Sequence, residues 1–292
     1  MEATYVTSII HIPNIGYRDF ILFVFLTTAT EKIEEGIETL ITRRQFIKGC
    51  ASSLLAVSVA EFLWQMPIGC GTADRQIPVL LYHRVGNTVG PLTVTPERFE
   101  RDLRQLKDAG YETISLQQFD RFLTDRDTEM PAKPLLITFD DGYRDNYENA
   151  FPLLSKYEMG AAFFVIAGML GELERVSVAD IQEMARYGMT IGSHTVTHRP
   201  LGELSVEEMR QELVQSRFIL ADALGAPVDS IAYPRGSYSN DTLTLADDFY
   251  TNGFTTVNGQ CSRASNPYAL RRIPVFSYDR DALDLIAKHR AV

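Results

Sequence analysis

The chain has 292 residues, of which 45% are hydrophobic and 23% charged, an ordinary composition for a globular protein. Its 28 Lys and Arg residues against 38 Asp and Glu residues give a formal net charge of −10, so it lacks the basic surface that nucleic-acid binding requires. Three cysteines without repeated spacing exclude a disulfide scaffold and a thiolate zinc site. No apolar run approaches the roughly 18 residues of a membrane-spanning helix.

The first seventy residues have the pattern of a targeting segment. Arg43 and Arg44 are followed by Phe46, Lys48 and a mildly apolar stretch, an order that resembles a twin-arginine export signal. The alternative is the start of a surface helix with two solvated arginines. We expect three segments: an N-terminal extension over residues 1–41, an export signal over 42–70 and one domain over 71–292.

The end of this segment allows two fates for the exported protein. Gly69-Cys70 resembles a lipoprotein processing site, although Pro67 stands where a leucine is usual. A lipid on Cys70 would anchor the protein to a membrane, whereas cleavage without lipid would leave it periplasmic or extracellular. Cys261 then remains in the domain, where we expect it to be a buried small hydrophobic residue.

Short apolar runs alternate with amphipathic stretches after residue 76. The expected strands are 77–82, 135–139, 160–166, 189–192 and 230–233, and a further strand-like stretch covers 270–275. The expected helices are 96–109, 147–157, 178–187 and 205–224. Thr95 caps the first of them, a capping box at Ser205–Glu208 begins the last, and Gly225 ends it.

This alternation determines the expected fold class. Strands that alternate with helices favour a mostly parallel sheet with crossover connections. The number of strand–helix units expected in a domain of this length favours a barrel over an open sheet. We therefore predict an α/β fold: a single domain forming a distorted or incomplete (β/α) barrel with about seven parallel strands.

Polar side chains follow four of the expected strands. They are His83 after 77–82, Asp140 and Asp141 after 135–139, His194 and His198 after 189–192, and Arg235 after 230–233. Reactive groups of parallel α/β folds gather at the carboxyl ends of strands, so we expect these residues to share one mouth. Taken singly, each has an ordinary interpretation, such as a turn and helix cap for the aspartates or a structural role for a lone histidine.

The histidines favour a metal site. His194 and His198 have the spacing that puts two imidazoles on one face of a helical turn. The chain has five histidines, and the remaining two, His11 and His289, lie near the termini and receive no predicted role. One carboxylate with two imidazoles leaves coordination positions open, as in catalytic metal sites. A second carboxylate could take a proton from water and a histidine opposite could give one to the leaving group, which predicts hydrolysis of an amide or ester.

Two of these segments carry a family resemblance. Thr138–Gly142 and Ser193–His198 resemble the first two motifs of the polysaccharide deacetylases, the NodB-homology domain of carbohydrate esterase family four, and the resemblance covers about residues 77–277. It implies that Asp140 is the catalytic base. It also implies three ligands of a divalent metal, usually zinc: Asp141, His194 and His198.

The catalytic acid of this family comes from a Leu-x-His motif near the C-terminus. No such motif follows a strand there in this chain, because His289 lies in a predicted helical tail. Leu81-Tyr82-His83 has the pattern at the start of the domain instead. This arrangement resembles the circularly permuted branch that includes the biofilm poly-N-acetylglucosamine deacetylases, and it implies that His83 is the general acid.

The third motif departs from the family pattern Arg-x-Pro-Tyr. Ala232 stands where an arginine usually orients the base, and Arg235 stands at the tyrosine whose backbone N–H helps to hold the oxyanion. The N–H of Arg235 can still serve, because any residue except proline supplies one. Arg272 is our candidate for the missing arginine and completes the predicted catalytic set, and the alternative for Arg272 is a surface salt bridge.

We therefore expect an exported, metal-dependent hydrolase that removes N-acetyl groups from N-acetylglucosamine units of an extracellular or cell-envelope polysaccharide. One alternative is an O-acetyl esterase acting on a polysaccharide such as xylan, since nothing in the sequence separates amide from ester. Another is a non-catalytic glycan-binding module on the same fold, because the third motif lacks its arginine. We expect a monomer with a polysaccharide partner, no nucleic acid, and membrane contact only through a lipid on Cys70.

Overall fold

The structure is a computed structural model that describes residues 75–124 and 129–289, all within the unit Gly71–Val292. The predicted N-terminal extension, the export signal and Cys70 lie outside the described residues. No helix in the described part is long and apolar enough to cross a membrane.

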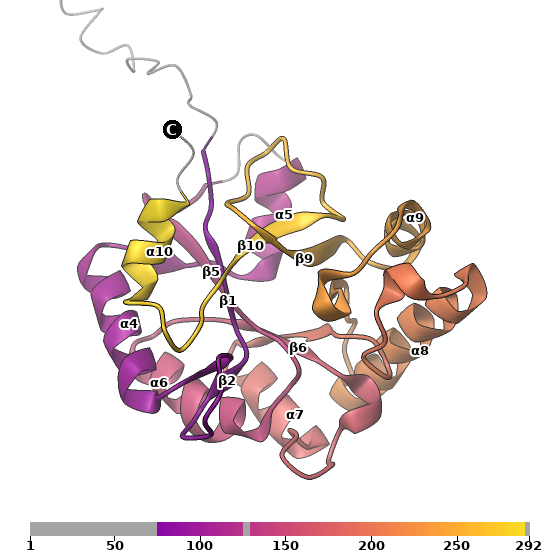
Figure 1. The fold of residues 1–292 in the computed structure, drawn as a ribbon, viewed down its shortest axis with the longest axis horizontal. Helices are drawn as coiled ribbons and strands as arrows, with labels where there is room; N and C mark the ends of the chain where they lie inside the picture. Colours follow the sequence, from indigo (N-terminus) through magenta and orange to yellow (C-terminus); the bar gives the residue numbers. More distant parts are fainter. Residues whose placement is uncertain (1–74, 125–128, 290–292) are drawn as a thin grey trace, which may run out of the picture. The chain divides into compact units, whose positions relative to one another are not determined.

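Parallel strands close into a barrel (Figure 1). Around the barrel, the seven strands that the described residues contribute are β1 (Val79–Tyr82), β10 (Leu270–Pro274), β9 (Asn252–Asn258), β8 (Ser230–Ala232), β7 (Thr190–Ser193), β6 (Ala162–Val165) and β5 (Pro134–Phe139). The predicted fold class is confirmed. The barrel is closed rather than incomplete, because β1 pairs residue for residue with Leu136–Phe139 of β5.

Three short strands lie outside this ring. β4 (Glu112–Thr113) pairs with the first residues of β5, and β2 (Arg84–Val85) pairs with β3 (Thr93–Val94). The last two flank a loop that follows β1 directly, so they lie near the carboxyl ends of the barrel strands.

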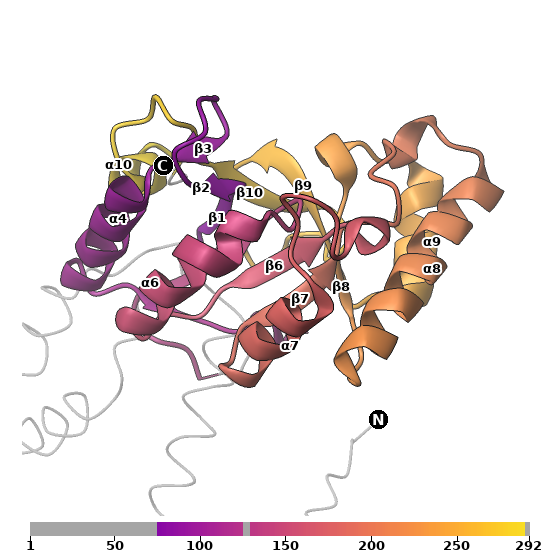
Figure 2. The ribbon, with the colours of Figure 1, turned by 90° about the horizontal axis from the view of Figure 1, so that it is seen from below.

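Helices surround the barrel (Figures 1 and 2). They are α4 (Pro96–Asp108), α6 (Phe151–Lys156), α7 (Val178–Arg186), α8 (Val206–Leu224), α9 (Asn240–Phe249) and α10 (Ala282–Lys288). Thr95 caps α4 by accepting from the Arg98 N–H at 3.2 Å, and the predicted capping box begins α8. Gly225 ends α8 with a φ of 66°, which glycine adopts without steric cost.

The barrel separates two layers of core. Outward-facing residues such as Leu80, Ile137 and Phe163 pack under the surrounding helices. Inward-facing residues such as Leu136, Phe164 and Phe254 form a second cluster with Phe119 and Phe122 of α5 (Leu116–Thr124). This alternation is what a pleated strand requires when both of its faces are buried.

The helix α5 lies at the end where the barrel strands begin. Its Asp120 accepts hydrogen bonds from Thr251 and Asn252 at the start of β9. The amino end of the barrel is thus filled with apolar and hydrogen-bonded side chains. Cys261 is fully buried beside this cluster, as predicted, and burial raises the pKa of its thiol to about 12.

Several elements differ from the sequence prediction. The helix expected over 147–157 begins as a π-helical turn, Asn146–Ala150, and becomes α-helical only at Phe151. Pro152 lacks the N–H that would continue an α-helical ladder back into that turn. The strand β9 was not predicted, because its first residues, Asn252 and Gly253, have the composition of a turn.

Candidate active site

The pairing of β1 with β5 brings two predicted site residues together. Tyr82 and Phe139 are partners in the register, so His83 and Asp140 both follow directly at the carboxyl end of the barrel. The Asp140 N–H donates to the Tyr82 carbonyl at 3.0 Å, which fixes this arrangement. The His83 Nδ1 is buried and has no hydrogen-bond partner among the described residues. Burial lowers the pKa of His83, although the nearby charges of Asp140 and Asp141 act in the opposite direction.

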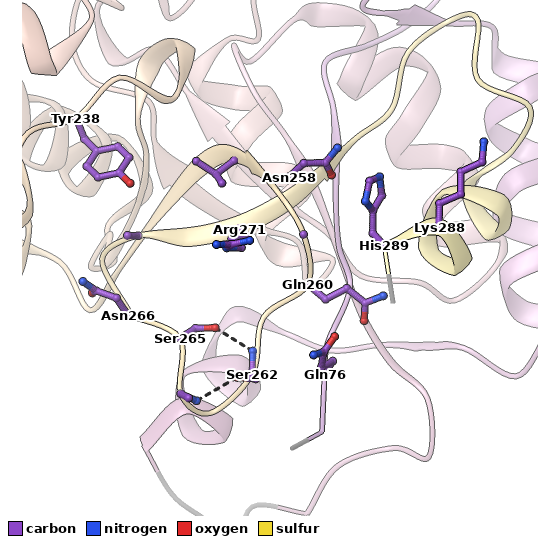
Figure 3. A pocket seen from close by; sticks show the side chains of 14 residues that line it. Gln76, Tyr238, Asn258, Gln260, Ser262, Ser265, Asn266, Arg271, Lys288 and His289 are labelled. Atoms are coloured by element: carbon purple, nitrogen blue, oxygen red, sulfur yellow. Dashed lines mark hydrogen bonds between the residues drawn. The ribbon is translucent and has the colours of Figure 1, made fainter. Parts of the chain in front are cut away.

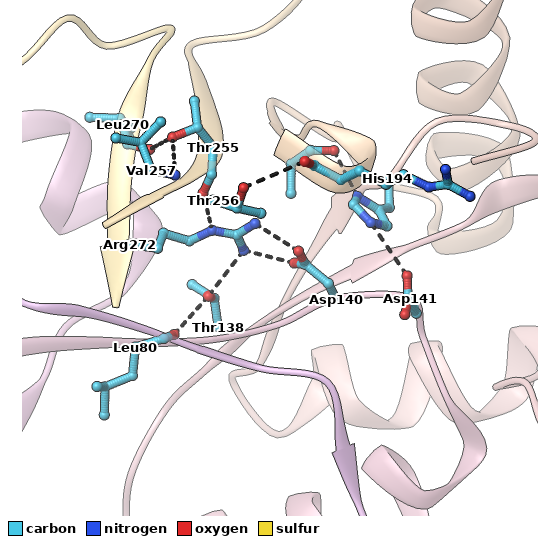
Figure 4. A network of polar contacts seen from close by, with 12 residues as sticks. Leu80, Thr138, Asp140, Asp141, His194, Thr255, Thr256, Val257, Leu270 and Arg272 are labelled. Carbon is cyan, nitrogen blue, oxygen red and sulfur yellow. Dashed lines mark hydrogen bonds and ion pairs between the residues drawn. The ribbon is translucent and has the colours of Figure 1, made fainter. Parts of the chain in front are cut away.

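Arg272 forms a paired contact with Asp140 inside the barrel (Figure 4). Its Nη1 and Nη2 donate to Oδ1 and Oδ2 of Asp140, each at 2.7 Å. Its remaining Nε donates to the Thr255 carbonyl at 2.8 Å. Arg272 is 0% exposed, so the alternative of a surface salt bridge is wrong.

This contact determines the ionisation of Asp140. Burial alone would raise the pKa of this carboxyl, but the charges of Arg272 and His194 outweigh burial and hold the pKa below its usual range. A second acceptor holds the guanidinium in place, because the Arg272 Nη1 also donates to the Thr138 hydroxyl at 3.3 Å. Asp140 is therefore an ionised carboxylate with a fixed orientation.

Three more predicted residues converge beside this pair. The ligand atoms of Asp141, His194 and His198 all lie within 4.8 Å of one another. The Asp141 Oδ1 is 3.4 Å from the His194 Nε2 and 3.2 Å from the His198 Nε2. His194 points its other ring nitrogen, Nδ1, at the Ala232 carbonyl at 2.7 Å, which holds the ring with Nε2 toward Asp141.

The donor set fits a divalent ion. Two imidazole nitrogens and one carboxylate oxygen are a common set of three protein ligands at catalytic zinc, where further positions stay open. Burial would raise the pKa of Asp141, but hydrogen bonds from His194 and His198 outweigh it and lower the pKa strongly. The carboxylate is thus available in the charged form that a metal needs.

Two residues that the sequence analysis did not single out hold Asp141. The Arg175 Nη1 donates to the Asp141 carbonyl at 2.8 Å, and the Tyr143 hydroxyl lies near the Asp141 carboxylate, so that burial and the Asp141 charge raise the pKa of Tyr143. The Arg175 guanidinium also lies over the Tyr143 ring, 4.3 Å from its centre. Asp141 has a φ of 72°, a left-handed conformation that a residue with a side chain adopts at a cost. No local sequence pattern reveals Arg175, because it belongs to a loop more than thirty residues away.

The third motif, which departs from the family pattern, also lies at this end of the barrel. Arg235 belongs to a short turn, Pro234–Gly236, that follows β8 directly. The Ala232 carbonyl that binds His194 lies three residues earlier, so this segment borders the metal-ligand cluster. Arg235 has a φ of 58°, a left-handed conformation, and its side chain is exposed. The fold therefore constrains its backbone rather than its side chain.

A separate cavity of about 760 Å³ lies on the outer side of β9 and β10 (Figure 3). Arg271 lines it, whereas Arg272 faces into the barrel, because successive residues of a strand point to opposite sides. His289 also lines this cavity, apart from the other described histidines. The convergent titratable groups therefore lie at the barrel mouth and not in this cavity.

Comparison with known proteins assigns the family. Residues 127–253 match the family model described as polysaccharide deacetylase. A Bacillus subtilis protein named as a polysaccharide deacetylase, YxkH, is 36% identical over 203 residues, which are 68% of this chain and 71% of that protein. The chain belongs to the polysaccharide deacetylase family.

Further similarities support this assignment. The structure of the Streptococcus pyogenes deacetylase PplD in complex with acetate has a TM-score of 0.71 and 30% identity, over 75% of this chain and 100% of that chain. The poly-beta-1,6-N-acetyl-D-glucosamine N-deacetylase of Staphylococcus aureus is 26% identical over 196 residues, 62% of this chain and 67% of that protein. This polysaccharide deacetylase is accordingly a hydrolase.

Proposed function

We propose that this polysaccharide deacetylase removes N-acetyl groups from N-acetylglucosamine units of an extracellular or cell-envelope polysaccharide in a metal-dependent reaction. The observation that carries the proposal is the buried pairing of Asp140 with Arg272 beside the cluster of Asp141, His194 and His198. A carboxylate held ionised next to a set of metal ligands can activate water for the hydrolysis of an amide. The similarity to an enzyme named for poly-N-acetylglucosamine supports the choice of substrate.

In this proposal Asp140 is the general base. It takes a proton from the water that attacks the acetyl carbonyl. Arg272 is a positioning residue, since it contacts Asp140 and keeps the carboxylate charged and correctly oriented. It thereby replaces the arginine that the third motif lacks at Ala232.

Asp141, His194 and His198 would hold a divalent ion, and we propose zinc because two imidazoles and one carboxylate suit it. When bound, such an ion polarises the acetyl carbonyl and makes water more acidic. The protein contributes the rest of the reaction through its own groups. The Arg235 N–H donates to the oxygen of the carbonyl as negative charge develops there. His83 in its protonated form gives a proton to the departing amine, and the charges of Asp140 and Asp141 favour that form against the effect of burial.

A non-catalytic role is less well supported than catalysis. Its basis in the sequence was the missing arginine of the third motif. Arg272 supplies a guanidinium to the base from a different strand, and its two terminal nitrogens, Nη1 and Nη2, both contact the carboxylate. The basis for a non-catalytic role is therefore removed.

The test is acetate release from N-acetylglucosamine oligomers by the purified protein, with and without a metal chelator. We expect release that the chelator abolishes and added zinc restores. Acetylated xylan serves as the matched ester substrate. Release from xylan alone would contradict an N-deacetylase and favour the esterase, and absence of release from both substrates with metal bound would contradict either activity.

Export is a second part of the proposal and rests on the Arg43–Arg44 pair ahead of an apolar stretch. We expect that Arg43→Lys together with Arg44→Lys retains the protein inside the cell, measured by fractionation. Unchanged export of this double variant would contradict the twin-arginine route.

A further inference from the structure

The helix α8 presents a buried carboxylate to the turn that carries the two metal-ligand histidines. The buried residues of α8 share one face at helical spacing: Met209, Glu212, Leu213, Ser216 and Leu220. Glu212 is 8% exposed. A glutamate is seldom buried unless its oxygens accept hydrogen bonds, so this residue needs donors from its neighbours.

The turn between the histidines supplies three donors to Glu212. The N–H groups of Val196 and Thr197 donate to its Oε2 at 2.8 and 2.9 Å. The Thr197 hydroxyl donates to its Oε1. A carboxylate has only acceptor sites and accepts all three bonds, whereas an amide would bring donors of its own to the same place.

The backbone of this turn explains why it needs such an acceptor. Thr195 and His198 have φ values of 65° and 61°, which are left-handed conformations. Such a conformation has a steric cost for any residue with a side chain, and β-branched Thr195 is a strong outlier. Successive N–H groups in a turn of this kind point into one concave space that binds an anion, and the Glu212 carboxylate fills it.

Contacts on both sides confine the same turn. The Ser193 hydroxyl donates to the Ser216 hydroxyl of α8 at 2.8 Å. On the other side, the Gly168 N–H donates to the Val196 carbonyl at 3.0 Å. A side chain at Gly168 would have its Cβ 2.6 Å from that oxygen, so this approach requires glycine. Glu212 is the charged member of this set.

We propose that Glu212 is a positioning residue for His194 and His198. It acts through the backbone of the turn, which must stay left-handed at His198 for the Nε2 of that ring to lie 3.2 Å from the Asp141 Oδ1. Without the carboxylate, the N–H groups of Val196 and Thr197 lose their acceptor and the turn relaxes. This inference rests on the proposed metal site and identifies the residue that shapes it.

The test is the affinity for zinc alone, measured by competition with a chromophoric chelator. We expect Glu212→Ala to weaken zinc binding by about 10- to 100-fold, the effect typical of residues that orient metal ligands. Glu212→Gln should weaken zinc binding less than Glu212→Ala, because its amide oxygen still accepts hydrogen bonds from both N–H groups. Glu207→Ala is the matched control, since Glu207 is an exposed carboxylate on the same helix, and its zinc affinity should equal that of the parent.

Thermal unfolding in the presence of chelator separates positioning from simple structural support. A Glu212→Ala protein that is less stable without metal but binds zinc as tightly as the parent would overturn the inference. If Glu212→Ala does not fold, Thr197→Val removes one of the three donors from an exposed position, and it should stay folded and bind zinc several-fold more weakly.

The two proposals fail in different ways. Unchanged zinc affinity in the Glu212 and Thr197 variants, or a parent protein that binds no zinc, would overturn the role of Glu212. A parent that binds zinc but releases no acetate would overturn the proposed function and leave the role of Glu212 intact.

Discussion

The candidate site has two halves, Asp140 on one side and the cluster of Asp141, His194 and His198 on the other, and they are held in place by different contacts. Asp140 is fixed by a side chain of the barrel interior, because Arg272 is fully buried and contacts both of its carboxylate oxygens. Asp141 and His198 have left-handed backbones: the Asp141 carbonyl accepts from Arg175 in a loop, and the turn that leads to His198 is hydrogen-bonded to Glu212 of α8. The proposed base is thus part of the core, whereas the proposed metal ligands depend on turns. Loss of Arg272 should therefore lower stability, whereas loss of the residues that support the ligands should mainly lower metal affinity.

The largest expected effect is on Asp140, the proposed base. Asp140→Asn cannot take a proton, so we expect acetate release to fall by about 100- to 10,000-fold, the usual contribution of a general base. Zinc affinity should stay at the level of the parent, because Asp140 is not in the ligand cluster. Unchanged turnover would remove Asp140 from the role of base.

The second effect is on the ligand half. His198→Ala should lose zinc affinity and acetate release together, by more than the roughly 100-fold that the loss of a supporting residue costs. His289→Ala is the matched control, because that histidine lines a separate cavity. Full zinc occupancy in the His198 variant, measured by elemental analysis after dialysis, would exclude His198 from the ligand set.

The third effect is on stability. Arg272→Met leaves the Asp140 charge buried without a partner, which should lower the free energy of unfolding by about 3–5 kcal/mol. Arg271→Met changes an exposed neighbour on the same strand and should shift stability by about 0.5 kcal/mol or less. Adding Asp140→Asn to Arg272→Met should restore much of the loss, because it removes the unpaired charge. Urea denaturation near neutral pH measures all four proteins, and a double variant no more stable than Arg272→Met would contradict this account.

The same pair predicts the response to acid. Since the charges of Arg272 and His194 outweigh burial and lower the pKa of Asp140 in the folded protein, the stability from the Asp140–Arg272 pair is fully present above about pH 4, the ordinary aspartate value. It is lost as the pH falls through the lowered folded-state pKa. The parent should therefore lose more stability between pH 5 and strongly acidic pH than the double variant, which lacks the pair. Equal losses in the two proteins would contradict the assignment.

The smallest effect concerns the support of Asp141. Arg175→Met removes the hydrogen bond to the Asp141 carbonyl but no ligand atom. We expect zinc affinity to fall by about 10-fold, with little change in stability, since Arg175 lies in a loop. Arg186→Met, at an exposed position of α7, is the control. A large loss of stability with unchanged zinc affinity would remove the contrast between the two halves.

Local sequence predicted the elements whose signals are local. The caps of α4 and α8 are as predicted, because a capping hydrogen bond spans only three residues. The strands β5 and β6 were predicted from their continuous apolar runs. The helices α5 and α9 were not predicted, nor was β9. The polar and turn-forming residues of α9 and β9 carry weak local signals, whereas Leu116, Phe119 and Phe122 of α5 have helical spacing that could have predicted it.

The site residues also differ in whether local sequence could predict them. Asp140 with Asp141 and His194 with His198 could be chosen from sequence, because each pair lies within five residues and follows a strand. His83 was chosen through the family resemblance, and the register of β1 with β5 then places it beside Asp140. Arg175 and Glu212 could not be chosen, because their contacts with the site are made to backbone atoms of distant loops.

The sequence by itself determined the family, the alternation of strands and helices, and the polar residues that follow the strands. Only the tertiary structure decided that the barrel is closed and that Arg272 contacts Asp140, a pair 132 residues apart in the chain. The physical reason is that strand register determines which side chains meet across the barrel. Register depends on how every strand packs against its neighbours, so no local stretch of sequence specifies it.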